Sequence, residues 1–282
     1  MSSDYLIEDI VSYILPHLVQ AGDYASEIQK RIVDQPAKSA FSDPAQQALT
    51  DADLSIQNFI EVLLLARFPE VCFYGEEYTS SLNDKYFLST DSIEIWLDPI
   101  DGTLRYQKGH DQFSIIISFA VQGICKASIW YLPRLGVFYY GSTWGGIKQG
   151  TREDAISGST GNFRKVSCFG DKIVTYKANG ELIEAFSGYQ FIDLSEISKP
   201  EVIGLYPTSF SEVAALVSND AGVIDLMIAG KFLEWGGGKC TNFNGDDIPP
   251  INPRINPSYK GGIVAASSPE LHKELLARVL EL

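Results

Sequence analysis

The segment 96–103, Trp-Leu-Asp-Pro-Ile-Asp-Gly-Thr, constrains this chain more than any other. An apolar, strand-like run leads into it and delivers two carboxylates three positions apart. Pro99 fixes its own φ and favours an extended conformation at the residue before it. We therefore expect Asp98 to end a strand and Asp101 to point back beside it, so that both carboxylates face one cation.

The two residues that follow suit an anion. Gly102 allows the backbone to approach a ligand closely, and Thr103 is a good first residue for a short helix whose N–H groups bind an oxyanion. Carboxylates for a hard cation next to N–H groups for an oxyanion indicate metal-assisted phosphoryl chemistry. The alternative is an Asp-Pro and Asp-Gly surface turn, because the same residue types favour turns.

Two more acidic residues in the N-terminal part have both a structural and a metal-binding interpretation. Asp53 lies in the first turn of a helix predicted over residues 50–68, where a carboxylate complements the helix dipole. Glu76 follows a short strand predicted at residues 71–74, and acids after a glycine often form a solvated turn. Because ligands gather beyond the ends of strands, Glu76 can instead join the aspartates of segment 96–103.

The rest of the N-terminal part reads as an α+β unit. Apolar residues at helical spacing predict a first helix over about thirty residues, bent or restarted at Pro16. Residues 34–49 predict a mobile loop that carries Lys38. Strands are predicted at 113–121, 125–131 and 137–140, and their nearly continuous apolar runs predict burial on both faces.

The C-terminal part alternates strands and helices, the pattern of an α/β unit, after a Thr-, Ser- and Gly-rich boundary at 151–162. Strands are predicted at 172–176, 190–194, 202–206 and 263–266, and helices at 211–218 and 269–282. Asp225 is embedded in an apolar stretch. A buried carboxylate there needs a partner or a metal, although an aspartate also caps helix starts.

Composition narrows the classes of partner. The net charge of −14 and the isoelectric point of 4.6 argue against binding a nucleic-acid polymer, because no basic patch would neutralise its phosphates. A small phosphate ester is compatible with this charge if metal ions cancel it locally. We see no membrane span and no signal pattern, and the four cysteines form no CxxC pair, so we expect a cytoplasmic protein.

Other phosphatase chemistries fit the sequence poorly. No cysteine has an arginine six residues on, which a cysteine-nucleophile phosphatase loop needs, and the three histidines form no spaced ligand pair for zinc. In haloacid-dehalogenase-type phosphatases the nucleophilic aspartate stands two positions before its acid partner, whereas Asp98 and Asp101 are three apart.

Together these motifs resemble the inositol monophosphatase superfamily, magnesium-dependent and lithium-sensitive phosphatases that include fructose-1,6-bisphosphatases and 3′(2′),5′-bisphosphate nucleotidases. The similar segments cover most of the chain, at residues 21–22, 50–53, 68–69, 75–77, 96–103 and 234–245. The resemblance implies a layered αβαβα sandwich and a homodimer. It also implies an N-terminal half, 1–155, with most of the metal ligands, and a C-terminal half, 165–282, that supplies Asp225 and the substrate pocket.

The resemblance further implies two to three Mg²⁺ ions. Glu76, Asp98 and the Ile100 carbonyl would bind one ion, and Asp98, Asp101 and Asp225 a second. Glu76 would help to hold a third, weaker ion.

The resemblance implies direct attack of water on a small phosphorylated metabolite. Thr103 and Glu76 would orient and deprotonate the water. Asp53 is counted with these two as a catalytic residue, and Asp53 and Lys38 would lie close to the third ion. The residues implied in phosphate or substrate binding are Asp101, Gly102, Thr103 and Asp225.

The chain departs from the family pattern around Asp225, where Ile224 precedes it and Met227 and Ile228 replace small residues. Inositol monophosphate is therefore the default substrate. Bisphosphate nucleotidase and fructose-1,6-bisphosphatase activities are alternatives, and a non-catalytic metal- and phosphate-binding relative is the alternative of another class.

Overall fold

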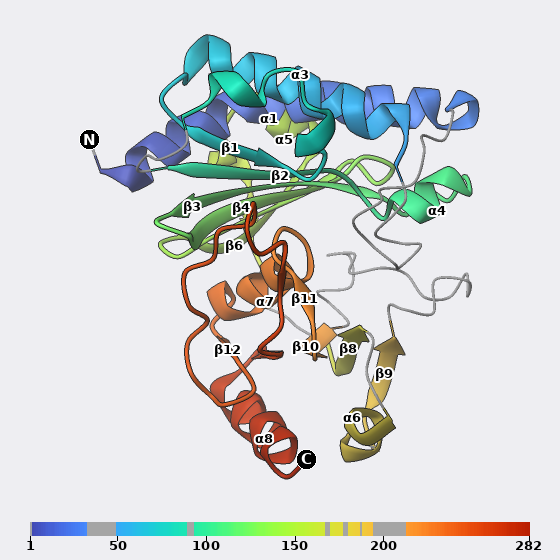
Figure 1. Cartoon of the computed structure of the whole chain (residues 1–282), viewed down its shortest axis with the longest axis vertical. Helices are drawn as coiled ribbons and strands as arrows, with labels where there is room; N and C mark the ends of the chain where they lie inside the picture. The colour runs from blue at the N-terminus through green and yellow to red at the C-terminus, as the bar shows by residue number, and fades with distance from the viewer. Residues whose placement is uncertain are drawn as a thin grey trace. The chain divides into compact units, whose positions relative to one another are not determined.

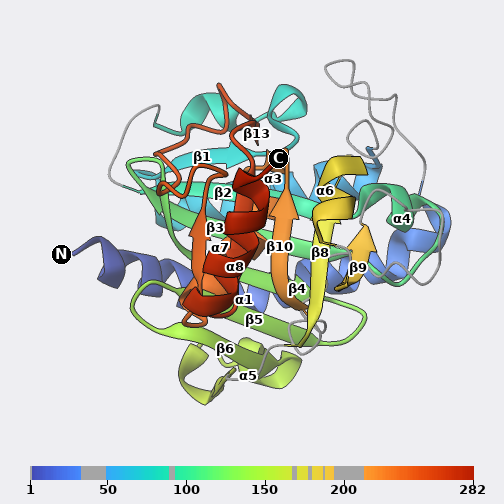
Figure 2. The same cartoon turned by 90° about the horizontal axis from the view of Figure 1, so that it is seen from below.

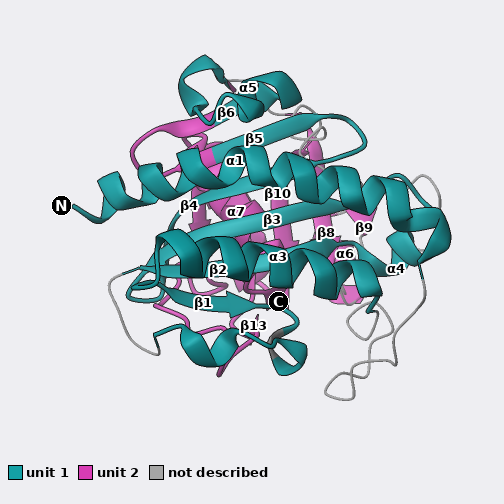
Figure 3. Ribbon diagram, turned by 90° about the horizontal axis from the view of Figure 1, so that it is seen from above, with its two compact units in different colours: residues 1–140, 148–164 teal, residues 141–147, 165–282 magenta. Residues whose placement is uncertain are grey.

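The computed structural model describes residues 2–32, 49–88, 93–166, 170–176, 180–186, 188–193 and 213–282. The chain folds into two compact units, Met1–Tyr140 with Lys148–Arg164, and Gly141–Ile147 with Lys165–Leu282 (Figure 3). The predicted loop with Lys38 and the predicted strand 202–206 lie outside the described residues.

The first unit holds most of a seven-stranded sheet in the order β1-β2-β3-β4-β5-β6-β7. Its strands are β1 (Cys72–Gly75), β2 (Glu94–Asp101), β3 (Ser114–Val121), β4 (Ile124–Leu132), β5 (Val137–Ser142), β6 (Gly146–Thr151) and β7 (Arg164–Lys165). β1 pairs with β2 in parallel, and β3 pairs antiparallel with both β2 and β4. The strands predicted at 113–121, 125–131 and 137–140 are β3, β4 and β5, which are consecutive in the sheet. Nearly every residue of β3 and β4 is buried, as their apolar runs predict.

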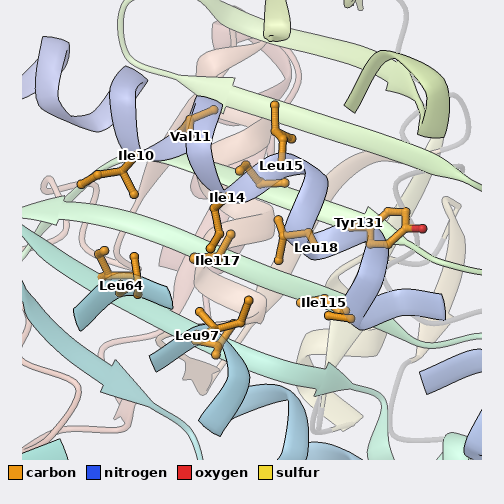
Figure 4. Packing of buried hydrophobic residues seen from close by; sticks show 14 of the residues in the cluster. Ile10, Val11, Ile14, Leu15, Leu18, Leu64, Leu97, Ile115, Ile117 and Tyr131 are labelled. Carbon is orange, nitrogen blue, oxygen red and sulfur yellow. The ribbon is translucent and has the colours of Figure 1, made fainter. Parts of the chain in front are cut away.

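Two long helices, α1 (Ser3–Ile28) and α3 (Asp51–Arg67), pack on one face of this sheet (Figure 1). Their apolar stripes meet alternate residues of the strands, such as Leu97, Ile115 and Ile117, in one core (Figure 4). α1 runs through Pro16 without a restart. The carbonyl that Pro16 leaves without an N–H partner belongs to Ser12 and lies close to Gly158, where an added Cβ would be 2.9 Å from it.

The second unit has a five-stranded sheet in the order β12-β14-β10-β8-β9. Its strands are β8 (Lys172–Tyr176), β9 (Gln190–Asp193), β10 (Val213–Ser218), β12 (Lys239–Thr241) and β14 (Ile263–Ala266). Helix α7 (Leu226–Trp235) packs through Gly230 against Ala265. Neighbouring residues of a strand point to opposite faces of the sheet, so Ala266 points away from α7. On that face it lies in the core formed with α6 (Gly180–Ala185) and α8 (Pro269–Leu280) (Figure 2).

The helix predicted at 211–218 is wrong, because residues 213–218 form strand β10. Every residue of β10 is buried, and the strand lies between β8 and β14. A short apolar run of this kind suits a helix or a central strand equally well, and here the pairing with both neighbours decides.

The described residues also form short helices and strands, among them four 3-10 helices, at Gln29–Arg31, Tyr78–Ser80, Asp84–Tyr86 and Thr160–Asn162. α4 (Thr103–Gln107) follows β2, and β11 (Ala221–Gly222) pairs with β13 (Ser258–Tyr259). The predicted boundary at 151–162 contains α5 (Arg152–Ile156) and belongs to the first unit. No helix within the described ranges is both long enough and apolar enough to cross a membrane.

Candidate active site

The ends of β1 and β2 bring acidic residues side by side. The two parallel strands are in register with Gly75 opposite Leu97, and the N–H of Glu76 donates to the Leu97 carbonyl at 2.9 Å. Glu76 therefore leaves β1 at the level where Asp98 continues β2. This is the sheet edge at which the sequence predicts that the acids gather.

The second aspartate is placed by an irregularity in β2. The strand does not end at Asp98 but continues to Asp101, and its register against β3 shifts between these two residues. Pro99 has no N–H for the ladder, and a bulge accommodates it. Asp98 Oδ1 accepts from the N–H of Ile100 at 3.1 Å, and Asp101 Oδ2 accepts from the Ser114 hydroxyl at 2.6 Å.

The electrostatics of this edge favour a bound cation. Burial raises the pKa of Asp101, and the nearby negative charge of Glu76 raises it further. The hydrogen bond from Ser114 and the positive charge of Arg105 act in the opposite direction and lower it. The net raised pKa means that holding the Asp101 carboxylate ionised beside Glu76 costs free energy, which a cation would offset.

Thr103 joins the end of β2 to helix α3. Gly102 has a positive φ of 85°, which turns the chain into α4 with Thr103 as its first residue. The buried Thr103 hydroxyl lies 2.8 Å from the Ile100 carbonyl and 3.2 Å from Asp53 Oδ1, and either oxygen can accept a hydrogen bond from it. Thr103 thus begins a short helix, as predicted, and contacts Asp53 as well.

Asp53 has the structural role that its position predicts. Its Oδ2 accepts from the N–H of Thr50 at 2.9 Å and from the Thr50 hydroxyl, forming the capping box of α3. Its other oxygen, Oδ1, accepts a hydrogen bond from the Thr103 hydroxyl. One fully buried carboxylate therefore fixes both the start of α3 and the Thr103 hydroxyl.

Asp225 belongs to the second unit. It is the N-cap of α7, and its Oδ1 accepts from the N–H of Leu226, so the helix-start role is confirmed. A Cβ added to Gly222 would lie 2.0 Å from Asp225 Oδ1, so the carboxylate lies close against this glycine.

The donor set suits a hard cation, although its side chains are engaged within the chain. Among the described residues, no three His, Cys, Asp or Glu side chains converge on one point. Glu76, Asp98 and Asp101 nevertheless supply only carboxylate oxygens, at the same end of neighbouring strands, and burial penalises the negative charge of Asp101. Mg²⁺ prefers this donor type, so the residues fit the predicted ion by their chemistry.

Sequence reasoning missed two buried polar residues on α3, Gln57 and Glu61. Gln57 Oε1 accepts from the N–H of Glu77 at 2.9 Å, and Gln57 Nε2 donates to Glu61 Oε1 at 2.9 Å. With Asp53 they recur every four residues along one side of the helix, beside the apolar stripe. This spacing could have indicated their burial from the sequence, because polar residues that repeat at the helical period beside an apolar stripe lie on the face that packs against the core.

Comparison with known sequences gives a family match and partial relatives. The model of the inositol monophosphatase family matches residues 11–184. A quinic acid degradation cluster protein of Neurospora crassa is 31% identical over 100 residues, 34% of this chain and 29% of that protein. The 3′(2′),5′-bisphosphate nucleotidase CysQ of Haemophilus influenzae is 27% identical over 136 residues, 48% of each. The chain spans half the length of these relatives or less.

Solved structures share the fold over the whole chain. An inositol monophosphatase of Thermotoga maritima has a TM-score of 0.70 at 18% identity and covers 97% of both chains. A dual inositol monophosphatase and NADP phosphatase, solved with Mg²⁺ and phosphate, has a TM-score of 0.63 at 15% identity and covers 92% of this chain and 90% of its own. The predicted layered α+β sandwich is thereby confirmed.

Proposed function

The chain belongs to the inositol monophosphatase family, and we propose that it is a Mg²⁺-dependent phosphomonoesterase that hydrolyses a small phosphate ester by attack of water. The observation that carries this proposal is that the neighbouring strands β1 and β2 deliver Glu76, Asp98 and Asp101 at the same end of the sheet, with Thr103 hydrogen-bonded to the buried Asp53.

Thr103 and Asp53 would act as a pair. When the Thr103 hydroxyl donates to the Asp53 carboxylate, its oxygen lone pairs are left to accept a hydrogen bond from water. A water held in this way has a defined orientation for in-line attack on phosphorus. Glu76 would accept the proton that the water loses.

Glu76, Asp98 and the Ile100 carbonyl would hold one Mg²⁺ ion. Asp98, Asp101 and Asp225 would hold another. When bound, the ions make water more acidic and neutralise the charge that develops on the leaving oxygen. The crystal structure of the NADP phosphatase relative with Mg²⁺ and phosphate supports the choice of ion.

The phosphate would be held at the start of α4. The N–H groups of Gly102 and Thr103 are placed there by the left-handed turn at Gly102. Asp101 and Asp225 would contact the substrate as well. We assign the substrate pocket to the second unit, and we keep the cytoplasmic location, the homodimer and the lithium sensitivity as parts of the proposal.

An inositol monophosphate is the first substrate to test, and a 3′(2′),5′-bisphosphate nucleotide is the second candidate, favoured by the similarity to the Haemophilus CysQ nucleotidase. The test is phosphate release from inositol 1-phosphate, 3′-phosphoadenosine 5′-phosphate, fructose 1,6-bisphosphate and an aryl phosphate, with Mg²⁺ and with Mg²⁺ plus Li⁺. Release from one ester, dependent on Mg²⁺, supports the proposal and names the substrate class. If no phosphate is released from any of the four esters although Mg²⁺ binds, the non-catalytic alternative is favoured.

A further inference from the structure

We propose that Gln57 is a positioning residue that fixes the backbone of Glu76, and that Glu61 holds Gln57 in place. This inference rests on the proposed function, because it assigns Gln57 a role through Glu76 as a metal ligand. It adds a function to α3, whose first turn already holds Thr103 through Asp53.

Both peptide groups next to Glu76 are anchored. The N–H of Glu76 donates to the Leu97 carbonyl at 2.9 Å, and the N–H of Glu77 donates to Gln57 Oε1 at 2.9 Å. The first bond fixes the peptide plane before the Glu76 Cα, and the second fixes the plane after it. With both planes fixed, the direction in which the Glu76 side chain leaves the backbone is set.

Gln57 is also close to the backbone on the other side. A Cβ added to Gly75 would lie 2.1 Å from Gln57 Oε1 and 2.3 Å from its Cδ. Only glycine at residue 75 leaves room for this amide. The carboxamide of Gln57 therefore contacts the chain on both sides of Glu76, from a side chain that is only 2% exposed.

Glu61 fixes the orientation of the Gln57 amide. Its Oε1 accepts from Gln57 Nε2 at 2.9 Å and from the Ser81 hydroxyl at 2.7 Å, and its Oε2 accepts from Asn83 Nδ2 at 3.0 Å. Because Nε2 is bound to a carboxylate, Oε1 must be the end that faces Glu77. The network also ties α3 to the segment that follows Glu77, through Ser81 and Asn83.

The central test replaces Gln57 by Met, which keeps the shape of the side chain and removes both hydrogen bonds. We expect the dissociation constant for Mn²⁺, measured by electron paramagnetic resonance, to rise about 10- to 100-fold, as when a partner of a metal ligand is lost. We expect kcat to fall while KM for the substrate stays within about threefold. In the metal-free protein, amide exchange in residues 75–83 should accelerate up to about tenfold, because one hydrogen bond is lost.

Three variants guard against a purely structural explanation. Asn58→Ala is the matched control, because it lies next to Gln57 on α3 and loses a bond to Asn83 without touching Glu77; it should bind Mn²⁺ like the wild type. Gln57→Glu should bind Mn²⁺ weakly, because it places two buried carboxylates face to face. Adding Glu61→Gln to Gln57→Glu exchanges donor and acceptor, and should restore most of the affinity.

The outcomes separate the two proposals. Wild-type Mn²⁺ binding and turnover with an unchanged, folded Gln57→Met variant would overturn the positioning role and leave the proposed function standing. The positioning role is also overturned if the double exchange fails to recover affinity although it folds. A wild type that binds no Mn²⁺ and releases no phosphate overturns the proposed function and the positioning role with it. The amide exchange of residues 75–83 then shows only that Gln57 stabilises the backbone at Glu77.

Discussion

Replacing Thr103 by Val separates a catalytic hydroxyl from a structural one. The side chain is 7% exposed, and its hydroxyl has two acceptors, the Ile100 carbonyl and Asp53. Valine fills the same volume, so the folding cost is one lost hydrogen bond to a buried carboxylate, about 1.5–3 kcal/mol. A domain stable by about 5 kcal/mol or more stays over about 95% folded after that loss. Partial unfolding therefore cannot lower the rate measurably.

If the hydroxyl orients the attacking water, its loss should reduce kcat about 10²- to 10⁴-fold, which corresponds to ~2.7–5.4 kcal/mol in the activation free energy. The assay is phosphate release at saturating Mg²⁺, with urea unfolding of the same samples. Thr103→Ser keeps the hydroxyl and should retain most of the activity. A Thr103→Val protein that is about 1.5–3 kcal/mol less stable yet turns over within threefold of the wild type would refute the catalytic role.

Three further predictions use other parts of the chain. Asp98→Asn should abolish Mg²⁺-dependent hydrolysis and leave the circular dichroism spectrum unchanged; unchanged turnover would refute the metal-ligand assignment. Gly75→Ala should cost about 1–3 kcal/mol in unfolding free energy and lower activity, because its Cβ would collide with Gln57. The His272 ring hydrogen-bonds to the Thr241 hydroxyl, and burial together with the positive charge of Lys239 lowers its pKa below the usual 6.5. The contribution of neutral His272 to the free energy of unfolding should therefore be fully present above pH 6.5 and be lost as the pH falls below that value. Urea midpoints of wild type and His272→Gln should therefore differ in pH dependence, and parallel curves would contradict this reasoning.

Much of the first unit was predictable because its signals are local. Thr50 and Pro69 bracket a helix by capping and chain-breaking chemistry, and α3 occupies the interval between them. The turn at Gln122 and Gly123, both with positive φ, separates two apolar strands as expected. In the second unit the short apolar run of β10 suits a helix or a strand, and only its neighbours in the sheet make it a strand.

The candidate site shows the same limit. The spacing of Asp98 and Asp101 predicts two neighbouring carboxylates, but the bulge that carries β2 on to Asp101 depends on pairing with β3, which sequence spacing does not encode. Asp53 had two interpretations, and it caps α3 while also bonding Thr103. Gln57 was missed because its partner, the Glu77 amide, is twenty residues away along the chain.

The measurement that tests the central claim most directly is phosphate release by the metal-free chain as Mg²⁺ is titrated back, with inositol 1-phosphate and 3′-phosphoadenosine 5′-phosphate as substrates and Asp98→Asn beside the wild type. We expect no release without metal, release by the wild type that saturates with Mg²⁺ on at least one ester, and none by the variant. Release that persists in the chelated protein, or an Asp98→Asn curve that overlays the wild type, would contradict it.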